Sequence, residues 1–176
     1  SMIKNVVGKV SAFLLLLVLC FALAGCGQAV SEEAISVQID GKPASFLFRS
    51  RTATQATDIW EVLPVYGDLE DTAPSVQPGE HKISIDFSGC AFPDWFAVYG
   101  YRGGVGEDGT DEVKYGDLAI DGCEQSENVF TLRFTSQESA HADEMAIFVF
   151  HMQCSAGAGG LQEVWMYVGC FTGGAA

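Results

Sequence analysis

Histidines are the first side chains to consider for acid–base chemistry near neutral pH, and this chain has three, at positions 81, 141 and 151. His81 begins an alternating apolar stretch and His151 lies within one, so we expect both to be strand residues with satisfied hydrogen bonds. His141 lies in a polar segment. Neither G-x-S-x-G nor H-E-x-x-H occurs in the sequence. We therefore expect a protein that is not an enzyme. The alternative is a hydrolase in which the fold brings one histidine into a cleft beside a carboxylate or hydroxyl.

The densest acidic run comprises residues 107–112, with Asp117 and Asp121 beyond it. Calcium takes about six to eight oxygen ligands, and loops can supply them. The run lacks the D-x-D-x-D-G spacing of an EF-hand. We expect a solvated loop and no cofactor, and keep a calcium site as the alternative. Its ligands would be Glu107, Asp108, Asp111 and Glu112.

Aromatic side chains recur on one face of two predicted strands. Trp95, Tyr99 and Tyr101 share a face of the first, and Trp165 and Tyr167 share a face of the second. Rings on an exposed β face can stack on sugars or pack against a protein, whereas rings on an inner face belong to the core. We expect the core for most of them. A carbohydrate-binding module, with these rings exposed and aligned, is the alternative.

The beginning of the chain has the features of a targeting segment. Lys4 and Lys9 precede an uncharged, almost wholly apolar run at 10–24, which ends in Leu23-Ala24-Gly25-Cys26. A basic head, an apolar run and small residues before a cleavage point are typical of a secretory signal peptide. The run is shorter than the ~20 residues that a spanning helix needs. Two small residues directly before a cysteine make the segment resemble the lipobox of bacterial lipoproteins.

That resemblance implies that Cys26 becomes the lipidated first residue of the mature protein. Two acyl chains suffice for stable anchoring, because each buried methylene contributes ~0.8 kcal/mol. We therefore expect a signal peptide at 1–25, a lipidated tether at 26–33 and one domain at 34–176. The expected location is outside the cytoplasm, held to the bacterial cell membrane by the lipid on Cys26.

The charge of the mature chain restricts its partners. The leader holds two of the nine basic residues and no acidic one, so the mature part carries seven basic and 23 acidic residues, a formal charge of −16. Such a balance argues against nucleic acid, whose affinity depends on Lys and Arg at phosphates. It also disfavours lying flat on an anionic membrane. Solubility is the simplest explanation, and a protein or glycan partner remains open.

Four cysteines remain beyond Cys26, and an even number in an exported chain indicates two disulfides. No C-x-x-C occurs, which argues against zinc. If successive strands cross the domain alternately, Cys90 shares one end with Cys170, and Cys123 shares the other with Cys154. Pairing Cys154 with Cys170 would join opposite ends of one hairpin, ~25–30 Å apart, whereas a disulfide allows about 4.4–6.8 Å between Cα atoms.

The alternation of apolar and polar residues predicts the strands that would position the side chains discussed above. Strands are expected at 34–40, 81–88, 95–102, 129–135, 145–154 and 161–171, with an edge strand at 59–66. Asp40-Gly41 predicts a hairpin that continues through Phe46 and Phe48. The stretch 145–154 is apolar on both faces, as in a central covered strand or one that offers a face to a partner.

Polar and glycine-rich stretches predict the loops. We expect them at 49–58, 67–79 and 103–128, the last with a short strand at 118–120. There is no long amphipathic helix and no βαβ rhythm. Seven or eight strands at regular spacing therefore predict an all-β, mainly antiparallel sandwich, with an immunoglobulin-like arrangement as one candidate.

Overall fold

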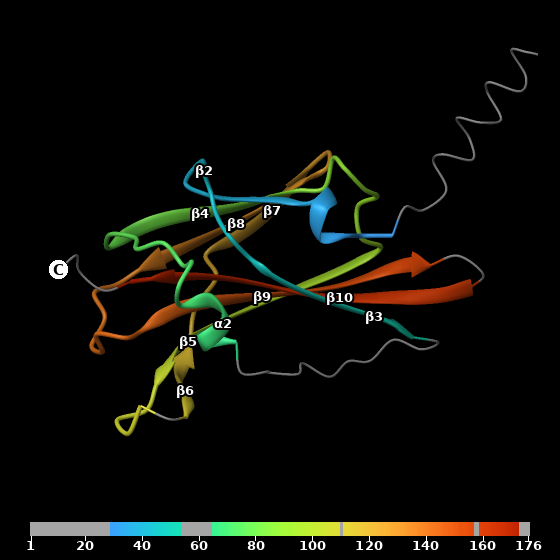
Figure 1. Cartoon of the computed structure of the whole chain (residues 1–176). Coiled ribbons are helices and arrows are strands. Elements are labelled where there is room, and N and C mark those ends of the chain that lie inside the picture. Colours follow the sequence, from blue (N-terminus) through green and yellow to red (C-terminus); the bar gives the residue numbers. More distant parts are fainter. Residues whose placement is uncertain (1–28, 54–64, 110, 157–158, 173–176) are drawn as a thin grey trace, which may run out of the picture.

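Two five-stranded sheets face each other in the computed structural model, which describes residues 29–53, 65–109, 111–156 and 159–172 (Figure 1). The first sheet contains, in spatial order, β2 (Lys42–Pro43), β1 (Ser36–Ile39), β4 (Gly79–Asp86), β8 (Val129–Ser136) and β7 (Gly122–Ser126). The second contains β3 (Leu47–Ala53), β10 (Gly160–Phe171), β9 (Met145–Ala156), β5 (Trp95–Val105) and β6 (Glu112–Asp117). Neighbouring strands are antiparallel in both sheets. The all-β sandwich predicted from alternation is confirmed.

The strands number ten in the described residues, rather than seven or eight. The additional ones are short edge strands such as β2, β6 and β7, in which few side chains are buried and alternation is weak. Their order also differs from the seven-strand immunoglobulin arrangement, in which four strands face three. The sandwich therefore stands without the immunoglobulin-like refinement.

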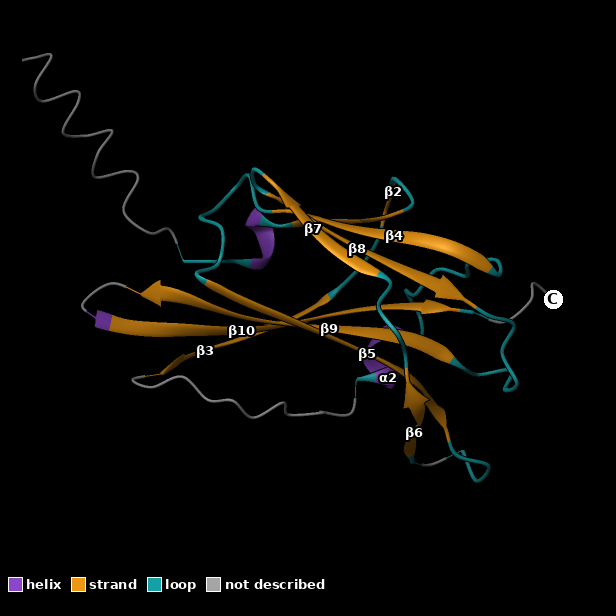
Figure 2. Cartoon of the chain, turned by 180° about the vertical axis from the view of Figure 1, so that it is seen from behind, coloured by secondary structure: helices purple, strands orange, loops and turns teal. Residues whose placement is uncertain are grey.

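The main core lies between the sheets, and a second apolar cluster lies on the outer face of the second sheet. On β9, Phe148 and Phe150 face the first sheet, whereas Ile147 and Val149 face the short helix α2 (Tyr66–Leu69). Figure 2 shows α2 against this outer face, beside β5. β9 is therefore a central strand covered on both sides, as its two apolar faces predict.

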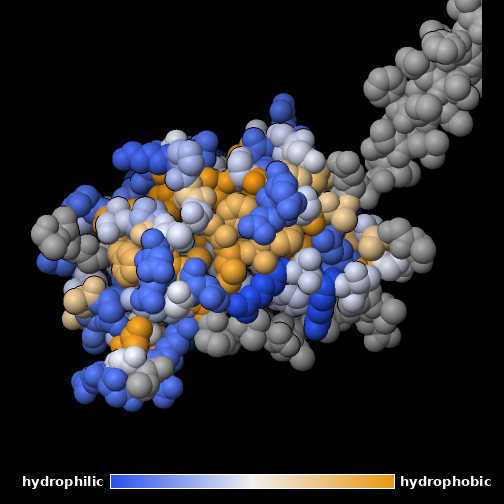
Figure 3. All heavy atoms as spheres, viewed as in Figure 1, coloured by the Kyte–Doolittle hydropathy of each residue, from blue (hydrophilic) through white to orange (hydrophobic). Residues whose placement is uncertain are grey.

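Two chain crossings close the edges of the sandwich. At one edge the chain passes from β2 to β3, and Figure 3 shows apolar side chains reaching the surface on this face of the molecule. At the other edge, residues 118–121 connect β6 to β7. The Leu118 N–H donates to the Gly100 carbonyl and the Asp121 N–H donates to the Arg133 carbonyl, each at 2.8 Å. Gly100 permits this approach, because a Cβ there would lie 3.1 Å from the Leu118 oxygen.

Two loop predictions are corrected by these strands, and one predicted strand lies mostly outside the described residues. The segment 103–128 is not a structureless loop, because it contains β6, the crossing and β7. Residues 49–53 belong to β3 rather than to a loop, and 54–58 lie outside the described residues. The predicted edge strand at 59–66 falls mostly outside them too, and its last residue begins α2.

The first hairpin is present, although its return strand is short. Asp40 and Gly41 have φ angles of 51° and 78°, as a tight turn requires, and join β1 to β2. The chain then crosses to the other sheet, so Phe46 and Phe48 pack from β3 and its approach rather than from the hairpin. Both pack against the main core, which explains why their alternation resembles a continued hairpin.

The domain begins before the predicted boundary at residue 34. Val30 is buried, and its backbone is held by the Gln162 side chain on β10. The Val30 N–H donates to Gln162 Oε1 at 3.0 Å, and Gln162 Nε2 donates to the Val30 carbonyl at 2.7 Å. The tether predicted at 26–33 is therefore corrected, since Val30 and the 3-10 turn Glu32–Ala34 belong to the domain.

The disulfide prediction is wrong. The four cysteines in the described part of the chain, Cys90, Cys123, Cys154 and Cys170, are free thiols. Cys90 lies in the β4–β5 connection, which is held to the Cys154 end of β9 by a hydrogen bond from the Asp94 N–H to the Gln153 carbonyl. Cys170 is opposite Ala146, eight residues away along β9, or ~26 Å at ~3.3 Å per residue.

The second proposed pair is separated as well. Cys123 lies on β7, an edge strand of the first sheet, and is exposed, whereas Cys154 is buried on the second sheet. The prediction assumed that successive strands alternate along one axis. The crossings between sheets break that alternation.

Candidate functional site

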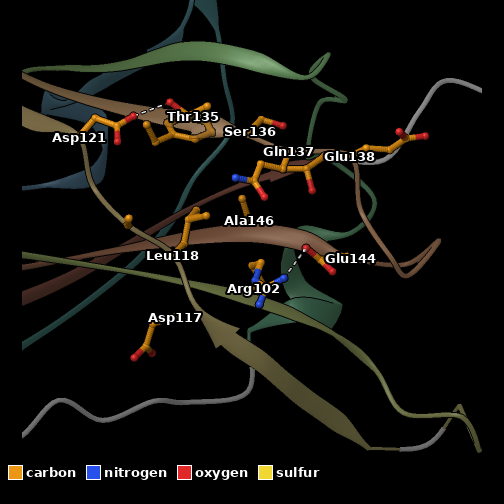
Figure 4. Close-up of a pocket in the computed structure, with 13 residues that line it drawn as sticks. Arg102, Asp117, Leu118, Asp121, Thr135, Ser136, Gln137, Glu138, Glu144 and Ala146 are labelled. Carbon is orange, nitrogen blue, oxygen red and sulfur yellow. Dashed lines mark hydrogen bonds and ion pairs between the residues drawn. The ribbon is translucent and has the colours of Figure 1, made fainter.

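One cavity lies at the end of the sandwich where β8 leaves the first sheet and β9 enters the second. Its volume is about 340 Å³. The connection 137–144 passes over this end, and the β6–β7 crossing closes its side (Figure 4). We call it the Glu144 pocket. Its charged lining residues are Arg102, Asp117, Asp121, Glu138 and Glu144, and its buried polar lining also includes Ser136 and Thr172.

Glu144 is the most unusual residue of the pocket. Its side chain is only 4% exposed, and the nearest cation is the Arg102 guanidinium, whose Nη1 lies 3.7 Å from Oε1. That distance exceeds hydrogen-bond length. The other oxygen, Oε2, is buried and has no hydrogen-bond partner among the described residues. Burial of a carboxylate oxygen without donors is costly, so Oε2 is an acceptor that no donor of the described residues satisfies.

Ser136 supplies a second buried polar atom. It ends β8, where its residue is 3% exposed and its Oγ has no partner within the described part of the chain. A hydroxyl can donate one hydrogen bond and accept others. Ser136 from the first sheet and Glu144 from the start of the second are therefore both lining residues of one cavity, and each has a buried polar atom without a partner among the described residues.

The acidic residues at the side of the pocket are already engaged. Asp121 Oδ2 accepts a hydrogen bond from Thr135 Oγ1 at 2.7 Å, which Figure 4 shows as a dashed line. Asp117 forms an ion pair with Lys114 at 2.6 Å and accepts a hydrogen bond from Tyr99. The hydrogen bond from Lys114 is the largest cause that lowers the pKa of Asp117. These two carboxylates contribute negative charge to the pocket while their own contacts hold them in place.

A second cavity of about 430 Å³ adjoins the first and contains His81. Its Nδ1 lies 2.7 Å from Asp40 Oδ2 and its Nε2 lies 2.6 Å from the Gln77 carbonyl. Burial alone would raise the pKa of Asp40, but hydrogen bonds from His81 and the Lys82 N–H outweigh it and lower that pKa. Both ring nitrogens are engaged by acceptors. The cleft therefore presents no ring nitrogen ready to take a proton from a substrate.

His151 is covered by aromatic rings. His151 is buried, stacks on Trp165 at 4.9 Å between centroids, and meets the edge of Trp95 at 5.2 Å. Its Nε2 lies 3.5 Å from Glu163 Oε1, and Arg51 pairs with the other Glu163 oxygen at 2.7 Å. This is a packed, charge-compensated cluster on the outer face of the second sheet.

His141 lies in the connection over the Glu144 pocket and stacks on Tyr115 at 4.0 Å. It is exposed, and no carboxylate contacts its ring in the hydrogen bonds and ion pairs of the described residues.

The structure does bring the five predicted aromatic residues to one face, the outer face of the second sheet, but it does not leave them open. Trp95 is 42% exposed and Tyr99 is half-buried. Tyr101, Trp165 and Tyr167 are buried, at 2%, 7% and 0%. Arg51 covers the Trp165 ring at 5.0 Å and Lys114 lies over Tyr99 at 4.7 Å. The expected core assignment fits most of these rings.

The predicted calcium ligands do not converge. Glu112 turns toward α2, where its Oε1 accepts the Val65 N–H at 3.0 Å and the Tyr66 N–H at 2.9 Å. Asp111 and its neighbours Glu107 and Asp108 border the turn between β5 and β6. Among the described residues no group of three or more His, Cys, Asp or Glu side chains is arranged to hold a metal ion. The calcium hypothesis therefore has no geometric support at these residues.

The sequence did not single out Glu144 or Ser136. Each stands beside an apolar strand in a polar segment, so it reads as a solvated loop residue. These two residues are buried because the two sheets come together at this end of the sandwich. The pattern of residues along each strand does not indicate that contact. Arg102, Asp117 and Asp121 were visible as charged residues, without a reason to place them in one cavity.

Comparison of the chain with protein-family models, curated proteins and solved structures found no match. Within the described residues, no helix has both the length and the apolar character needed to span a bilayer.

Proposed function

We propose that the chain is a non-catalytic, lipid-anchored protein of the bacterial cell envelope that binds a small polar ligand in the Glu144 pocket. The observation that carries the binding function is the cavity itself, whose lining includes two residues, Glu144 and Ser136, that each have a buried polar atom without a hydrogen-bond partner among the described residues. Cavities of roughly 300–1,000 Å³ with a few placed polar groups are typical of small-molecule sites. The pocket is near the small end of that range.

The lack of a catalytic set supports a binding role. His81 has both ring nitrogens engaged, and its cavity is lined by no serine, threonine or cysteine. Nucleophilic catalysis requires a nucleophile within reach of a base. The Glu144 pocket contains hydroxyls but no histidine in its lining. The geometry therefore favours a ligand that is held rather than converted.

The proposed lipid anchor is inferred from the Leu23-Ala24-Gly25-Cys26 motif. Together with the fold, it implies where the pocket would lie relative to the membrane. Val30 is bound by Gln162, close to the β9–β10 hairpin, whereas the pocket includes Ala146 at the other end of β9. Gln162 pairs opposite Cys154, so the two ends are ~26 Å apart at ~3.3 Å per residue. With lipid on Cys26, only three residues separate the anchor from Val30. The pocket then opens away from the bilayer.

Two experiments test the proposal. For the anchor, bacteria that express the full chain are fed an alkyne-tagged fatty acid, and the incorporated label is measured. Cys26→Ser is expected to abolish labelling, whereas the matched leader variant Cys20→Ser retains it. Labelling that persists in Cys26→Ser would refute the anchor.

For the pocket, native mass spectrometry of the purified full chain is expected to detect a small-molecule adduct. Ser136→Trp, which fills the cavity, should remove the adduct. Glu124→Trp, an exposed position on β7, should retain it. An adduct that survives the cavity-filling variant would place the ligand elsewhere.

A further inference from the structure

Two of the described thiols, Cys90 and Cys154, belong to one apolar cluster. Cys154 lies on the face of β9 that is turned toward the first sheet, and it is part of the main core at 7% exposure. Cys90 lies in the connection from β4 to β5, is partly buried, and packs against the same core. One thiol therefore comes from the segment that leaves the first sheet, and the other comes from the second sheet.

Hydrogen bonds hold the connection that carries Cys90 against the position of Cys154 on β9. The Asp94 N–H donates to the Gln153 carbonyl at 2.9 Å, and Asp94 Oδ2 accepts the Ser155 N–H at 2.7 Å. Because one of these contacts lies just before Cys154 and the other just after it, Asp94 lies beside Cys154 at the end of the β5–β9 pairing. Cys90 precedes Asp94 by only four positions.

The beginning of the connection is fixed to the core as well. The Cys90 N–H donates to the Phe87 carbonyl at 2.9 Å, which closes a tight turn directly after β4. Phe87 is fully buried, and its ring meets that of Phe92 at 5.1 Å between centroids. Phe92 packs against the main core and stacks on Phe96 at 6.2 Å. Rings on both sides of Cys90 therefore hold the turn against the apolar interior that contains Cys154.

The two thiols are near enough to influence each other. Burial raises the pKa of Cys154 to about 11, with smaller contributions from the charges of Asp94 and Cys90. Burial also raises the pKa of Cys90. A shared metal ion does not account for the pair, because no group of three or more His, Cys, Asp or Glu side chains in the described parts of the chain is arranged to hold one.

We propose that Cys90 and Cys154 form a reversible disulfide that joins the β4–β5 connection to β9 when the chain meets a disulfide oxidant. The structure describes the dithiol form, and this pair differs from both pairs expected from the sequence. A disulfide requires Cα atoms about 4.4–6.8 Å apart, and any adjustment falls on the turn, because Cys154 is fixed in the pairing of β9 with β10. The exported location proposed above is where such oxidants act.

The reaction is a thiol–disulfide exchange in two steps. The Cys90 thiolate, which is the less buried of the two, attacks one sulfur of the oxidant, forms a mixed disulfide and releases the first thiol of the oxidant. The Cys154 thiolate then attacks the Cys90 sulfur and releases the second. The protein loses two electrons and two protons, and the disulfide of the oxidant is reduced to two thiols.

Peptide mapping of the purified full chain in detergent micelles tests the pair. The native chain is equilibrated in buffers of reduced and oxidised glutathione, and the remaining thiols are blocked with iodoacetamide in urea. Digestion with trypsin and a glutamyl endopeptidase then places the four cysteines of the domain in four different peptides, with Cys90 in 83–102 and Cys154 in 145–163. The expected product is a monomer in which these two peptides are joined.

Variants and heat test the same link. Cys90→Ser and Cys154→Ser are each expected to abolish it, whereas the matched variant Cys123→Ser, at an exposed position on β7, should retain it. Oxidation should raise the melting temperature of the wild type by roughly 5–15 °C, because the link closes a long loop of the unfolded chain. Cys90→Ser should show no such rise, and its partly exposed position makes it the variant to use if Cys154→Ser does not fold.

Three outcomes would overturn the proposal. The first is a link between any other two peptides, or one that joins two chains. The second is a link between 83–102 and 145–163 that forms only after unfolding in urea, because the native fold would then not bring the thiols together. The third is complete alkylation of Cys90 and Cys154 after equilibration with excess oxidised glutathione. None of these results bears on the Glu144 pocket, so the two proposals fail separately.

Discussion

Removal of the Gln162 side chain should release the N-terminal segment from the sandwich. Gln162 makes two hydrogen bonds to the Val30 backbone, one as acceptor at 3.0 Å and one as donor at 2.7 Å, and both are buried. In Gln162→Ala, the Val30 N–H and carbonyl would have no partner if the segment stayed in place. A buried backbone group left unpaired costs about 1–3 kcal/mol, so the pair would cost about 2–6 kcal/mol.

The segment can avoid that cost by detaching. Detachment exposes the Val30 side chain, which is worth about 1.5–3 kcal/mol when fully buried, and returns backbone entropy of about 1–2 kcal/mol for each freed residue. The loss of stability is set by whichever costs less free energy, the unpaired backbone groups or the detachment of the segment. We therefore expect the free energy of unfolding to fall by about 1–3 kcal/mol, with residues 29–34 detached in the remaining native state.

Two measurements on the full chain check this expectation. Urea denaturation gives the loss of stability, and hydrogen exchange should show a Val30 amide that is protected in the wild type and unprotected in Gln162→Ala, while the β10 amides stay protected. Gln125→Ala, which removes an exposed glutamine amide on β7, is the matched control and should change stability by less than about 0.5 kcal/mol. A Val30 amide that remains protected in a variant of unchanged stability would refute the docking.

Two further predictions concern thiols and acid. Burial raises the pKa of Cys170 to about 12, whereas Cys123 is exposed. Iodoacetamide at pH 8 should therefore label Cys123 in the native chain and Cys170 only on unfolding. If no cysteine were labelled until a reductant was added, the assignment of free thiols would be contradicted. Hydrogen bonds from the Ser155 side chain and backbone lower the pKa of Asp94. Its contribution is therefore present above the unfolded value near 4 and lost as pH falls through the lower folded value. Asp94→Ala should lower stability by about 0.5–1 kcal/mol at pH 7 and by less as the pH falls through the folded pKa, in acid titrations of the urea midpoint, and a loss that does not shrink on acidification would contradict the assignment.

The strands that the sequence located well are those whose faces differ in environment. β4 alternates because Ile83 and Ile85 face the core while the residues between them face out. β9 has two apolar faces because one meets the other sheet and the other meets α2. In both strands the burial of each residue depends on the direction in which its side chain points, so the order of apolar and polar residues along the strand indicates it.

Elements fixed by partners far along the chain were predicted poorly. Tyr66 begins a helix whose first N–H groups are held by Glu112, 46 residues later. The segment 103–128 resembles a loop because β6 and β7 are edge strands that bury few side chains. The disulfide pairing failed for a related reason, since β6 and β7 were not predicted and, with them, β5 and β9 run antiparallel rather than in the same direction. A short stretch of sequence around any one of these elements does not include its partners.

The net charge of the chain follows from its composition, and it does not say what each carboxylate does in the fold. Several carboxylates have structural partners: Glu112 holds the start of α2, Asp143 accepts the Val105 N–H at 2.6 Å, and Glu163 pairs with Arg51. From the sequence these residues are equivalent to Glu144, because each is an acid beside an apolar stretch. The difference is that Glu144 lies at the junction of two sheets, where one oxygen faces Arg102 and the other is buried without a partner among the described residues. A net charge of −14 for the whole chain therefore says little about what any one carboxylate does, because each role depends on partners that the fold brings together.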